Sequence, residues 1–163
     1  MTAPFSITVD DAQVHASLAR LIRHVSDLTP IMKDIGAALG NLTGDAFQAE
    51  GPGWPQLKPS TVKKRGNAHP ILQMDGQLAA SITHGGDRNS AWVGASKVYA
   101  AVQQFGQRKG ASGTTRRGAP IPWGDIPARP YIPMTASGDL TTAAHDEVMD
   151  ILTRALRAAI GQG

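Results

Sequence analysis

Apolar and polar residues follow two different periods along the first fifty positions. Residues 5–9 alternate, which is typical of a short half-buried strand. Between Val14 and Leu28 apolar positions instead recur every three or four residues, after two aspartates that can cap a helix. The same spacing resumes after Thr29-Pro30, a pair suited to starting a helix, and continues to about Phe47. We therefore predict one short strand and two N-terminal helices.

Three glycines lie in a row on the flank of the second predicted helix. Gly36, Gly40 and Gly44 each cost roughly 1 kcal/mol relative to alanine in a helix interior, so another backbone is expected to approach them closely. That backbone belongs either to a helix of the same chain or to a neighbouring subunit. Charged residues interrupt the segment, and no stretch reaches the ~18 apolar residues of a membrane span, so we expect no membrane contact.

A third apolar stripe, from about Ser137 to Ile160, predicts a long C-terminal helix. Its carboxylates gather toward the start and its arginines toward the end, the order that the helix dipole favours. The stripe covers roughly 200° of the helix, whereas a surface helix needs only ~100°. We expect such a helix to be covered on two sides, by its own core and by another subunit.

The middle of the chain predicts short elements between turns. A loop rich in glycine and proline surrounds Trp54, and Ser60 is expected to cap a short basic helix. A turn at residues 85–89 between apolar segments predicts a two-stranded antiparallel pair over about 80–95. The expected fold class is α+β, with a small antiparallel sheet packed with two N-terminal helices and a long C-terminal helix, in a single domain over residues 1–163.

Composition narrows the chemistry of the chain. It has no cysteine, so disulfides, thiolate nucleophiles and cysteine-based zinc sites are excluded. Aromatic residues make up only 5%, so we expect a core of alanine, leucine, isoleucine and valine. The five histidines show no zinc-site spacing, and neither a nucleophile elbow nor a phosphate loop is present. We predict no enzyme, no cofactor and no metal site, and, without a signal peptide pattern, a soluble protein made in a cytoplasm.

Positive charge is concentrated in one part of the chain, although the formal net charge is only +3. No acidic residue occurs between Asp87 and Asp125, and a long loop rich in glycine, serine and threonine is predicted over residues 107–123. The loop lacks aromatic residues before Trp123, so it offers no stacking platform for bases. It either contacts DNA phosphates or is a loop that is solvated or ordered by a protein partner, and we favour the second alternative. The candidate contact residues are Arg108, Lys109, Arg116 and Arg117.

Proline stiffens the segment that follows this loop, residues 126–133, which we call the strap. Pro127, Pro130 and Pro133 fix their own φ angles and favour extended backbone before them, so the strap is ordered before it docks. Arg129 presents five donors in a rigid fork. We expect it to bind carbonyls or a carboxylate, either as an internal clamp or across a subunit interface.

Three blocks of residues occur in a fixed order along most of the chain. The first is GWPQL followed by STVKKR, within residues 53–65. The second is ILQMDGQLAASI at residues 71–82. The third comprises VGA at 93–95, YAAVQQFG at 99–106 and PARPY at 127–131. Together these blocks resemble the phage virion morphogenesis, or tail completion, family of Mu-like and P2-like bacteriophages.

Two departures from the family pattern are visible. Asp75 stands where a hydroxyl residue is common, and Val102 precedes Gln103 where a histidine is common. Neither change affects the glycine or phenylalanine of the shared blocks.

The resemblance implies a non-enzymatic structural protein of the virion neck or tail. Such a protein completes the tail or joins it to the head as a ring of identical subunits, so the expected partners are other copies, tail-tube and neck or connector proteins, and packaged DNA through non-specific contact. Assembly is expected in the bacterial host cytoplasm. The alternative is a DNA-binding accessory protein acting through the basic loop. The residues expected to contact a subunit or partner are Trp54, Tyr99, Gln104, Phe105, Arg129, Pro130 and Tyr131.

Overall fold

The computed structural model describes residues 27–51 and 53–161. In chain order these residues form α2 (Thr29–Gln48), α3 (Pro59–Arg65), a 3-10 turn η1 (Ala79–Ser81), β1 (Ile82–Gly86), β2 (Ala91–Ala95), α4 (Ala100–Phe105) and α5 (Thr142–Gly161). The predicted α+β class is confirmed. The strand expected at residues 5–9 and the first predicted helix, as far as residue 26, lie outside the described residues.

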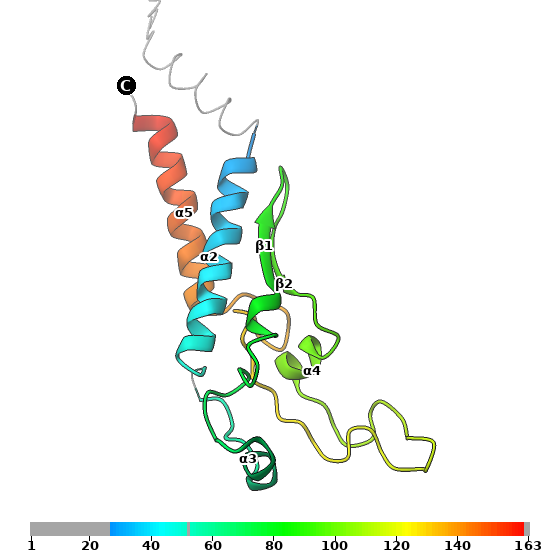
Figure 1. Cartoon of the computed structure of the whole chain (residues 1–163). Helices are drawn as coiled ribbons and strands as arrows, with labels where there is room; N and C mark the ends of the chain where they lie inside the picture. Colours follow the sequence, from blue (N-terminus) through cyan, green and yellow to red (C-terminus); the bar gives the residue numbers. More distant parts are fainter. Residues whose placement is uncertain (1–26, 52, 162–163) are drawn as a thin grey trace, which may run out of the picture.

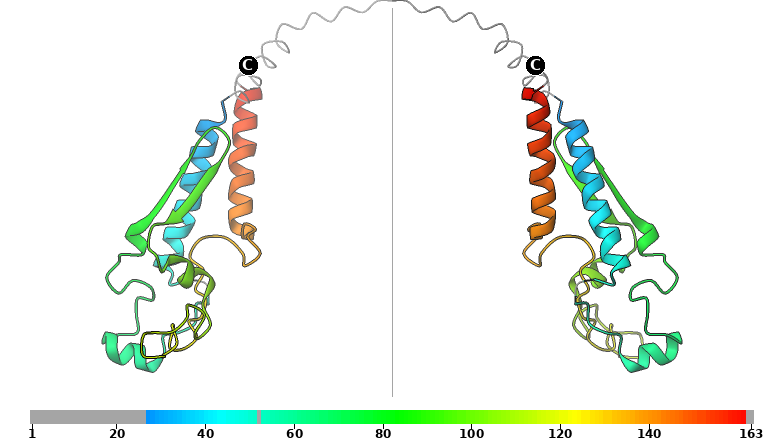
Figure 2. Two further views of the ribbon diagram at one scale, coloured as in Figure 1. Left: turned by 90° about the vertical axis from the view of Figure 1, so that its right-hand side faces the viewer. Right: turned by 90° about the vertical axis from the view of Figure 1, so that its left-hand side faces the viewer.

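Helix α2 is the central element, with the β1–β2 pair on one side and α5 on the other (Figure 1). Helices α2 and α5 lie side by side and antiparallel (Figures 1 and 2). Helices α3 and α4 and the long loops gather at one end of the molecule, where α2 ends and α5 begins (Figures 1 and 2). The predicted end of α2 near Phe47 is confirmed, and the helix starts at the predicted Thr29-Pro30 pair. Thr29 was expected to cap the helix, but it lies inside it, since Leu28 is the N-cap residue and no side chain caps the helix.

The glycine row on α2 provides the space for strand β1. A Cβ added at Gly36 would lie 2.2 Å from the carbonyl oxygen of Gly85, and one at Gly40 would lie 2.4 Å from the His84 ring. A Cβ at Gly44 would meet nothing within 4 Å. The segment that approaches the glycines therefore belongs to the same chain, which was one of the two predicted alternatives. It is strand β1, however, and not a helix.

Strands β1 and β2 pair antiparallel, with Ile82 opposite Ala95 and Gly86 opposite Ala91. The turn between them begins two residues later than predicted, at residues 87–90. The Asp87 carboxylate accepts hydrogen bonds there from the backbone N–H groups of Asn89 and Ser90, both at 2.8 Å. Gly85 and Gly86 belong to β1 because they pair with Trp92 and Ala91 of β2. A Cβ added at Gly86 would lie 2.3 Å from the Met32 backbone of α2, whereas one at Gly85 would lie 2.8 Å from the Trp92 side chain.

The core divides into two clusters. Between α2 and α5 it is aliphatic, as predicted, and contains Ile35, Leu39, Ala144 and Ile151. The second cluster corrects the expectation of an aliphatic core, because three aromatic residues meet in it. The Phe47 ring lies 6.0 Å from that of Trp54 and 5.2 Å from that of Tyr131.

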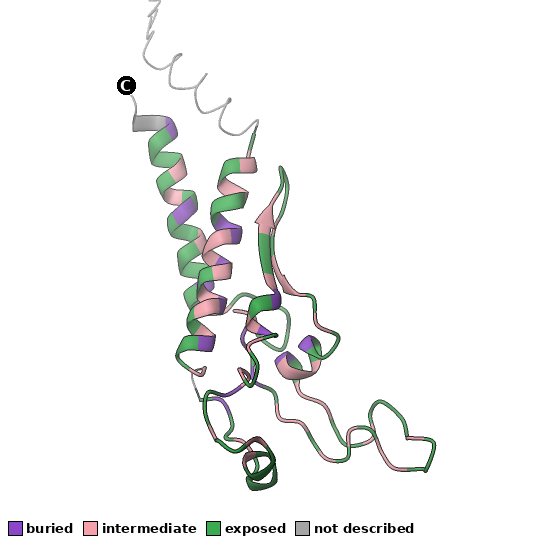
Figure 3. Cartoon of the chain, viewed as in Figure 1, coloured by how far each residue is buried: buried purple, intermediate pink, exposed green. Residues whose placement is uncertain are grey.

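Helix α5 begins later than the predicted Ser137. Residues 135–139 form a turn closed by Thr135 N–H donating to the Asp139 carbonyl at 2.7 Å, so the helix starts only at Thr142. The described residues cover its outer face only in part, with Met149 48%, Leu152 38% and Leu156 51% exposed (Figure 3). Burial of this stripe against another subunit remains a prediction.

Candidate interaction surfaces

The side chain of Gln104, on α4, holds the strap in place of a neighbouring strand. Its Oε1 accepts hydrogen bonds from the N–H groups of Tyr131 at 2.9 Å and Ile132 at 3.0 Å. Its Nε2 donates to the carbonyl oxygen of Ile132 at 3.1 Å. Buried backbone groups require such partners, and the strap has no strand beside it among the described residues to supply them. The Gln-Phe-Gly block therefore has a structural role.

Three hydrogen bonds, one donated by the loop and two by the strap, lock the strap to the Trp54 loop. The indole N–H of Trp54 donates to the carbonyl of Pro130 at 2.8 Å, while Arg129 donates from Nε to the Pro55 carbonyl at 2.9 Å and from Nη2 to the Gln56 carbonyl at 3.2 Å. Arg129 is only 5% exposed, and burial lowers the pKa of its guanidinium from its ordinary value. Within the described chain, Arg129 acts as the internal clamp that was one of the two alternatives.

Tyr131 fixes the strap to α4 from inside the core. Its side chain is 2% exposed, and its hydroxyl donates to the carbonyl of Ala100 at 3.1 Å. Burial raises the pKa of this phenol. The ring therefore contributes both apolar packing and a satisfied polar end, as buried tyrosines require.

The residues predicted to contact a partner separate into an inner and an outer set. The inner set is buried inside the subunit and comprises Trp54, Gln104, Arg129 and Tyr131. The outer set is exposed and comprises Tyr99, Phe105 and Pro130. The inner four hold the fold together, so these side chains are not on the surface of the folded chain, and partner contact stays a prediction for the outer three.

Gly106 determines how the chain leaves α4. It adopts a φ of +73°, and an added Cβ would lie 2.7 Å from Ala128 N. Beyond it, Gln107 and Ile126 exchange two backbone hydrogen bonds of 2.8 Å and so bring the two ends of the basic loop together. At position 106, therefore, only glycine fits without strain.

The basic loop forms a hairpin-like arm, which we define as residues 107–126. Bonds between its two legs include Ser112 N–H to the Ile121 carbonyl at 2.8 Å and Thr115 N–H to the Ala119 carbonyl at 2.7 Å. The sequence predicted a long irregular loop, whereas the structure shows a segment whose two legs are joined by backbone hydrogen bonds. The arm extends away from the body, beyond α4 and on the side remote from α5 (Figure 1).

All four cations predicted on this loop are exposed. Arg116 and Arg117 occupy the tip of the arm, and Arg108 and Lys109 lie near its base. No carboxylate among the described residues forms an ion pair with any of these four side chains. Trp123 is 76% exposed beside the base and was given no contact role from the sequence.

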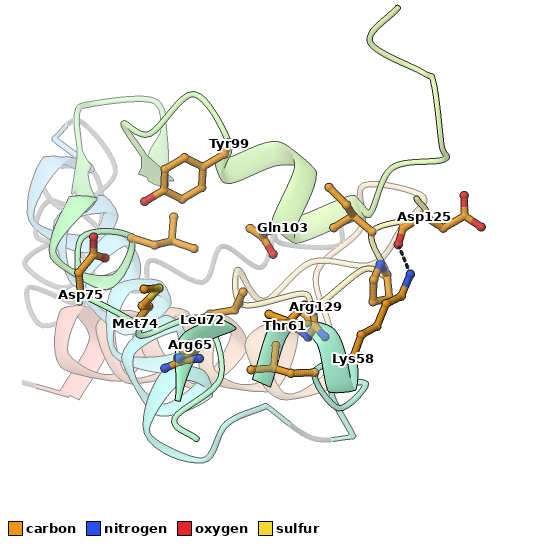
Figure 4. Close-up of a pocket in the computed structure, with 14 residues that line it drawn as sticks. Lys58, Thr61, Arg65, Leu72, Met74, Asp75, Tyr99, Gln103, Asp125 and Arg129 are labelled. Atoms are coloured by element: carbon orange, nitrogen blue, oxygen red, sulfur yellow. Dashed lines mark hydrogen bonds between the residues drawn. The ribbon is translucent and has the colours of Figure 1, made fainter. Parts of the chain in front are cut away.

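A cavity of about 360 Å³ lies between α3, α4 and the strap. Leu72, Met74 and Tyr99 line it, and Lys58 and Arg65 stand at its edge (Figure 4). Lys58 Nζ donates to the carbonyl of Asp125 at 3.0 Å, which ties α3 to the base of the arm. The exposed Tyr99 thus belongs to a surface with an apolar floor and a basic edge.

A groove follows the seam between α2 and α5. Its upper part, about 440 Å³, is lined by three carboxylates, Asp34, Asp45 and Glu147, and by one guanidinium, Arg154. Its lower part, about 320 Å³, shares Leu42 and Asp45 with the upper part and is apolar, because the strap and the start of α5 supply its wall. We call the two parts together the α2/α5 groove. Sequence reasoning assigned no contact role to its carboxylates.

The end of α2 is anchored by Glu50. Its carboxylate accepts hydrogen bonds from His69 Nδ1 at 2.5 Å and from Ile71 N–H at 3.3 Å. The bond from His69 lowers the pKa of Glu50 from its ordinary value. This contact connects the two core segments on either side of α3.

Two negative findings apply to residues 27–51 and 53–161. No three histidine or acidic side chains in these ranges lie close enough together to hold a metal ion. None of the helices formed there is long and apolar enough to cross a membrane.

Comparison with known proteins identifies relatives over almost the whole chain. Residues 9–157 match the phage virion morphogenesis family. The putative capsid assembly protein G of Escherichia phage Mu is 30% identical over 171 residues, covering 99% of this chain and 100% of the relative. The Mu-like prophage FluMu G protein 2 of Haemophilus influenzae is 32% identical over 131 residues, covering 79% of this chain and 83% of the relative. No solved structure matches. The chain therefore belongs to the phage virion morphogenesis family.

Proposed function

We propose that this protein is a ring-forming structural subunit of the phage neck or tail, which completes the tail or joins it to the head. The observation that carries the proposal is the family match over residues 9–157. Membership gives a role in virion morphogenesis, and the name of the Mu relative points to assembly rather than to catalysis. We extend that role to a position in the neck or tail and to a ring of identical subunits.

Two exposed features at opposite ends of the molecule support a ring. The α5 stripe presents Met149, Leu152 and Leu156 at one end, and the arm presents Trp123 and four cations at the other (Figure 2). Closed rings require heterologous contacts, in which two different patches of each subunit meet. Large exposed apolar side chains grouped on a surface favour association.

Native mass spectrometry of the purified chain, alone and with isolated tail tubes, tests this proposal. We expect one closed oligomer that binds at the end of the tube, visible by negative-stain electron microscopy. Phage lacking this protein should yield heads and tails that remain unjoined or tails of abnormal length. A chain that neither oligomerises nor binds tails, combined with normal virions in its absence, would contradict the proposal.

The arm also supports a second candidate, a DNA-binding accessory function. Its four exposed cations have no acidic ion-pair partner among the described residues. If each contacts a phosphate, the logarithm of the DNA binding constant should fall with the logarithm of salt concentration with a slope of about −3.6. A gel shift that stays tight near physiological salt would favour this candidate over the ring.

A further inference from the structure

We propose that the arm of one subunit docks in the α2/α5 groove of a second copy of this chain. The occupant is thus another subunit, and the contact is heterologous because the arm and the groove are different surfaces of one chain. The inference rests on the proposed homo-oligomer and specifies which two surfaces join within it.

The charges of the two surfaces are opposite. The arm carries Arg108, Lys109, Arg116 and Arg117, and the sole carboxylate in residues 107–126 is Asp125. That carboxylate already accepts a hydrogen bond from Lys109 N–H at 2.8 Å. The groove presents three carboxylates and one guanidinium, and the described residues provide no ion-pair partner for Asp34 or Asp45. Complementary charge of this kind selects partners and aligns them.

The apolar parts of the two surfaces also correspond. Trp123 is 76% exposed and Ile121 39% exposed on the same leg of the arm. The lower part of the groove is walled by apolar residues such as Leu42 and Ile132. A tryptophan buried in an apolar pocket, surrounded by polar contacts, is the usual centre of a strong protein interface.

The dimensions of the arm and the groove agree. Asp34 and Asp45 lie eleven residues apart on α2, which is about 16 Å along the helix and three turns, so both face the same side. Along the arm, Arg117 and Trp123 are six residues apart, which is at most about 20 Å of extended chain. With Trp123 in the apolar part, this upper limit is long enough for the tip arginines to approach the carboxylate at the far end of the groove.

The arm of a subunit does not occupy the groove of that same subunit. The backbone hydrogen bonds of the arm join arm residues to one another, and its side-chain bonds stay within the arm or run to Lys58. The arm lies at the end of the molecule remote from the start of α2 and the end of α5 (Figures 1 and 2). Both surfaces therefore remain available for another copy, which is what a head-to-tail ring requires.

A charge-exchange experiment on the full-length chain tests the pairing. One variant carries Arg116→Glu and Arg117→Glu in the arm, and the other carries Asp34→Arg and Asp45→Arg in the groove. All four side chains are exposed, so both variants should retain the circular dichroism spectrum of the wild type. The matched control, Lys63→Glu with Lys64→Glu on α3, makes the same charge change on another exposed surface.

Each variant alone should lose assembly, with a dissociation constant at least about a hundred-fold higher than that of the wild type, because like charges then face one another. An equimolar mixture should assemble, since each arm then meets a groove of opposite charge. The variant that combines all four changes should assemble by itself. The control should assemble like the wild type, and Trp123→Ala should weaken assembly by at least about ten-fold.

The outcomes separate this inference from the proposed function. Wild-type-like assembly by the arm variant overturns the pairing while leaving the ring intact, and a simultaneous loss of double-stranded DNA binding would assign the arm to DNA. Loss of assembly by both variants without rescue on mixing also overturns the pairing. A wild-type chain that stays monomeric at every concentration, with and without tail tubes, refutes the ring and the pairing together.

Discussion

Replacing Arg129 with alanine tests whether the clamp holds the subunit together from within. The side chain is 5% exposed and donates two hydrogen bonds to carbonyls of the Trp54 loop. A hydrogen bond to a charged group contributes about 1.5–3 kcal/mol, which gives about 3–6 kcal/mol for the two. The alanine variant also avoids the cost of burying a charged guanidinium, which offsets part of this loss. We therefore expect the free energy of unfolding to fall by about 2–4 kcal/mol.

Urea unfolding followed by circular dichroism measures this change. With a slope of about 2 kcal/mol per molar urea, the midpoint should fall by about 1–2 M. Arg129→Lys keeps the charge but loses the fork, so its midpoint should lie between those of the wild type and Arg129→Ala. Arg157→Ala makes the same chemical change on an exposed face of α5 and should shift stability by less than about 1 kcal/mol.

The clamp explanation is refuted if Arg129→Ala unfolds within about 0.5 kcal/mol of the wild type. Loss of the oligomer with unchanged monomer stability would instead make Arg129 an interface residue. Because assembly itself raises apparent stability, all variants must be compared at a concentration where the wild type and the variants have the same oligomeric state.

Three further predictions concern other contacts. Gly36→Ala places a Cβ 2.2 Å from a β1 carbonyl oxygen and should lower thermal stability by about 2–4 kcal/mol, whereas Gly44→Ala meets nothing within 4 Å and should raise it by up to about 1 kcal/mol. The bond from His69 lowers the pKa of Glu50 in the folded protein, so ionised Glu50 stabilises the fold. This stabilisation should be complete at pH values above the pKa of Glu50 in the unfolded chain and lost as the pH falls through its pKa in the folded chain. Glu50→Gln should therefore flatten the acid side of a plot of unfolding free energy against pH. Gln104→Leu removes three bonds to the strap and should lower the unfolding free energy measured in urea by about 2–4 kcal/mol.

Helical periodicity predicted the long helices well, because one face of each is buried along its whole length. The Thr29-Pro30 pair predicted where α2 starts. The bend of the chain before α5 was not predicted, although Gly138, with a φ of +95°, lies in it. Ser60 was expected to cap α3, but the helix begins at Pro59 and no side chain caps it. Periodicity identifies a buried face, whereas the end of a helix depends on a few local hydrogen bonds.

The shared blocks indicated which residues matter but not whether they face inward or outward. Trp54 and Gln104 have polar groups that suit an interface as well as a core, and only the carbonyls of Pro130 and Ile132 show where those groups bond. The groove was missed because Asp34 and Asp45 look like solvated helix residues. Their spacing of eleven positions, which returns to the same helix face, was the available signal.

The bond pair between Gln107 and Ile126 makes the arm a replaceable module. Since the two ends meet there, residues between them can be added, removed or exchanged while Gly106 and the strap keep their positions. Closing a loop of twice the length costs only about 0.6 kcal/mol more. The reach and charge of the arm can therefore change without rebuilding the core, and, under the pairing that we propose, an arm transplanted between relatives should carry its assembly preference to the recipient.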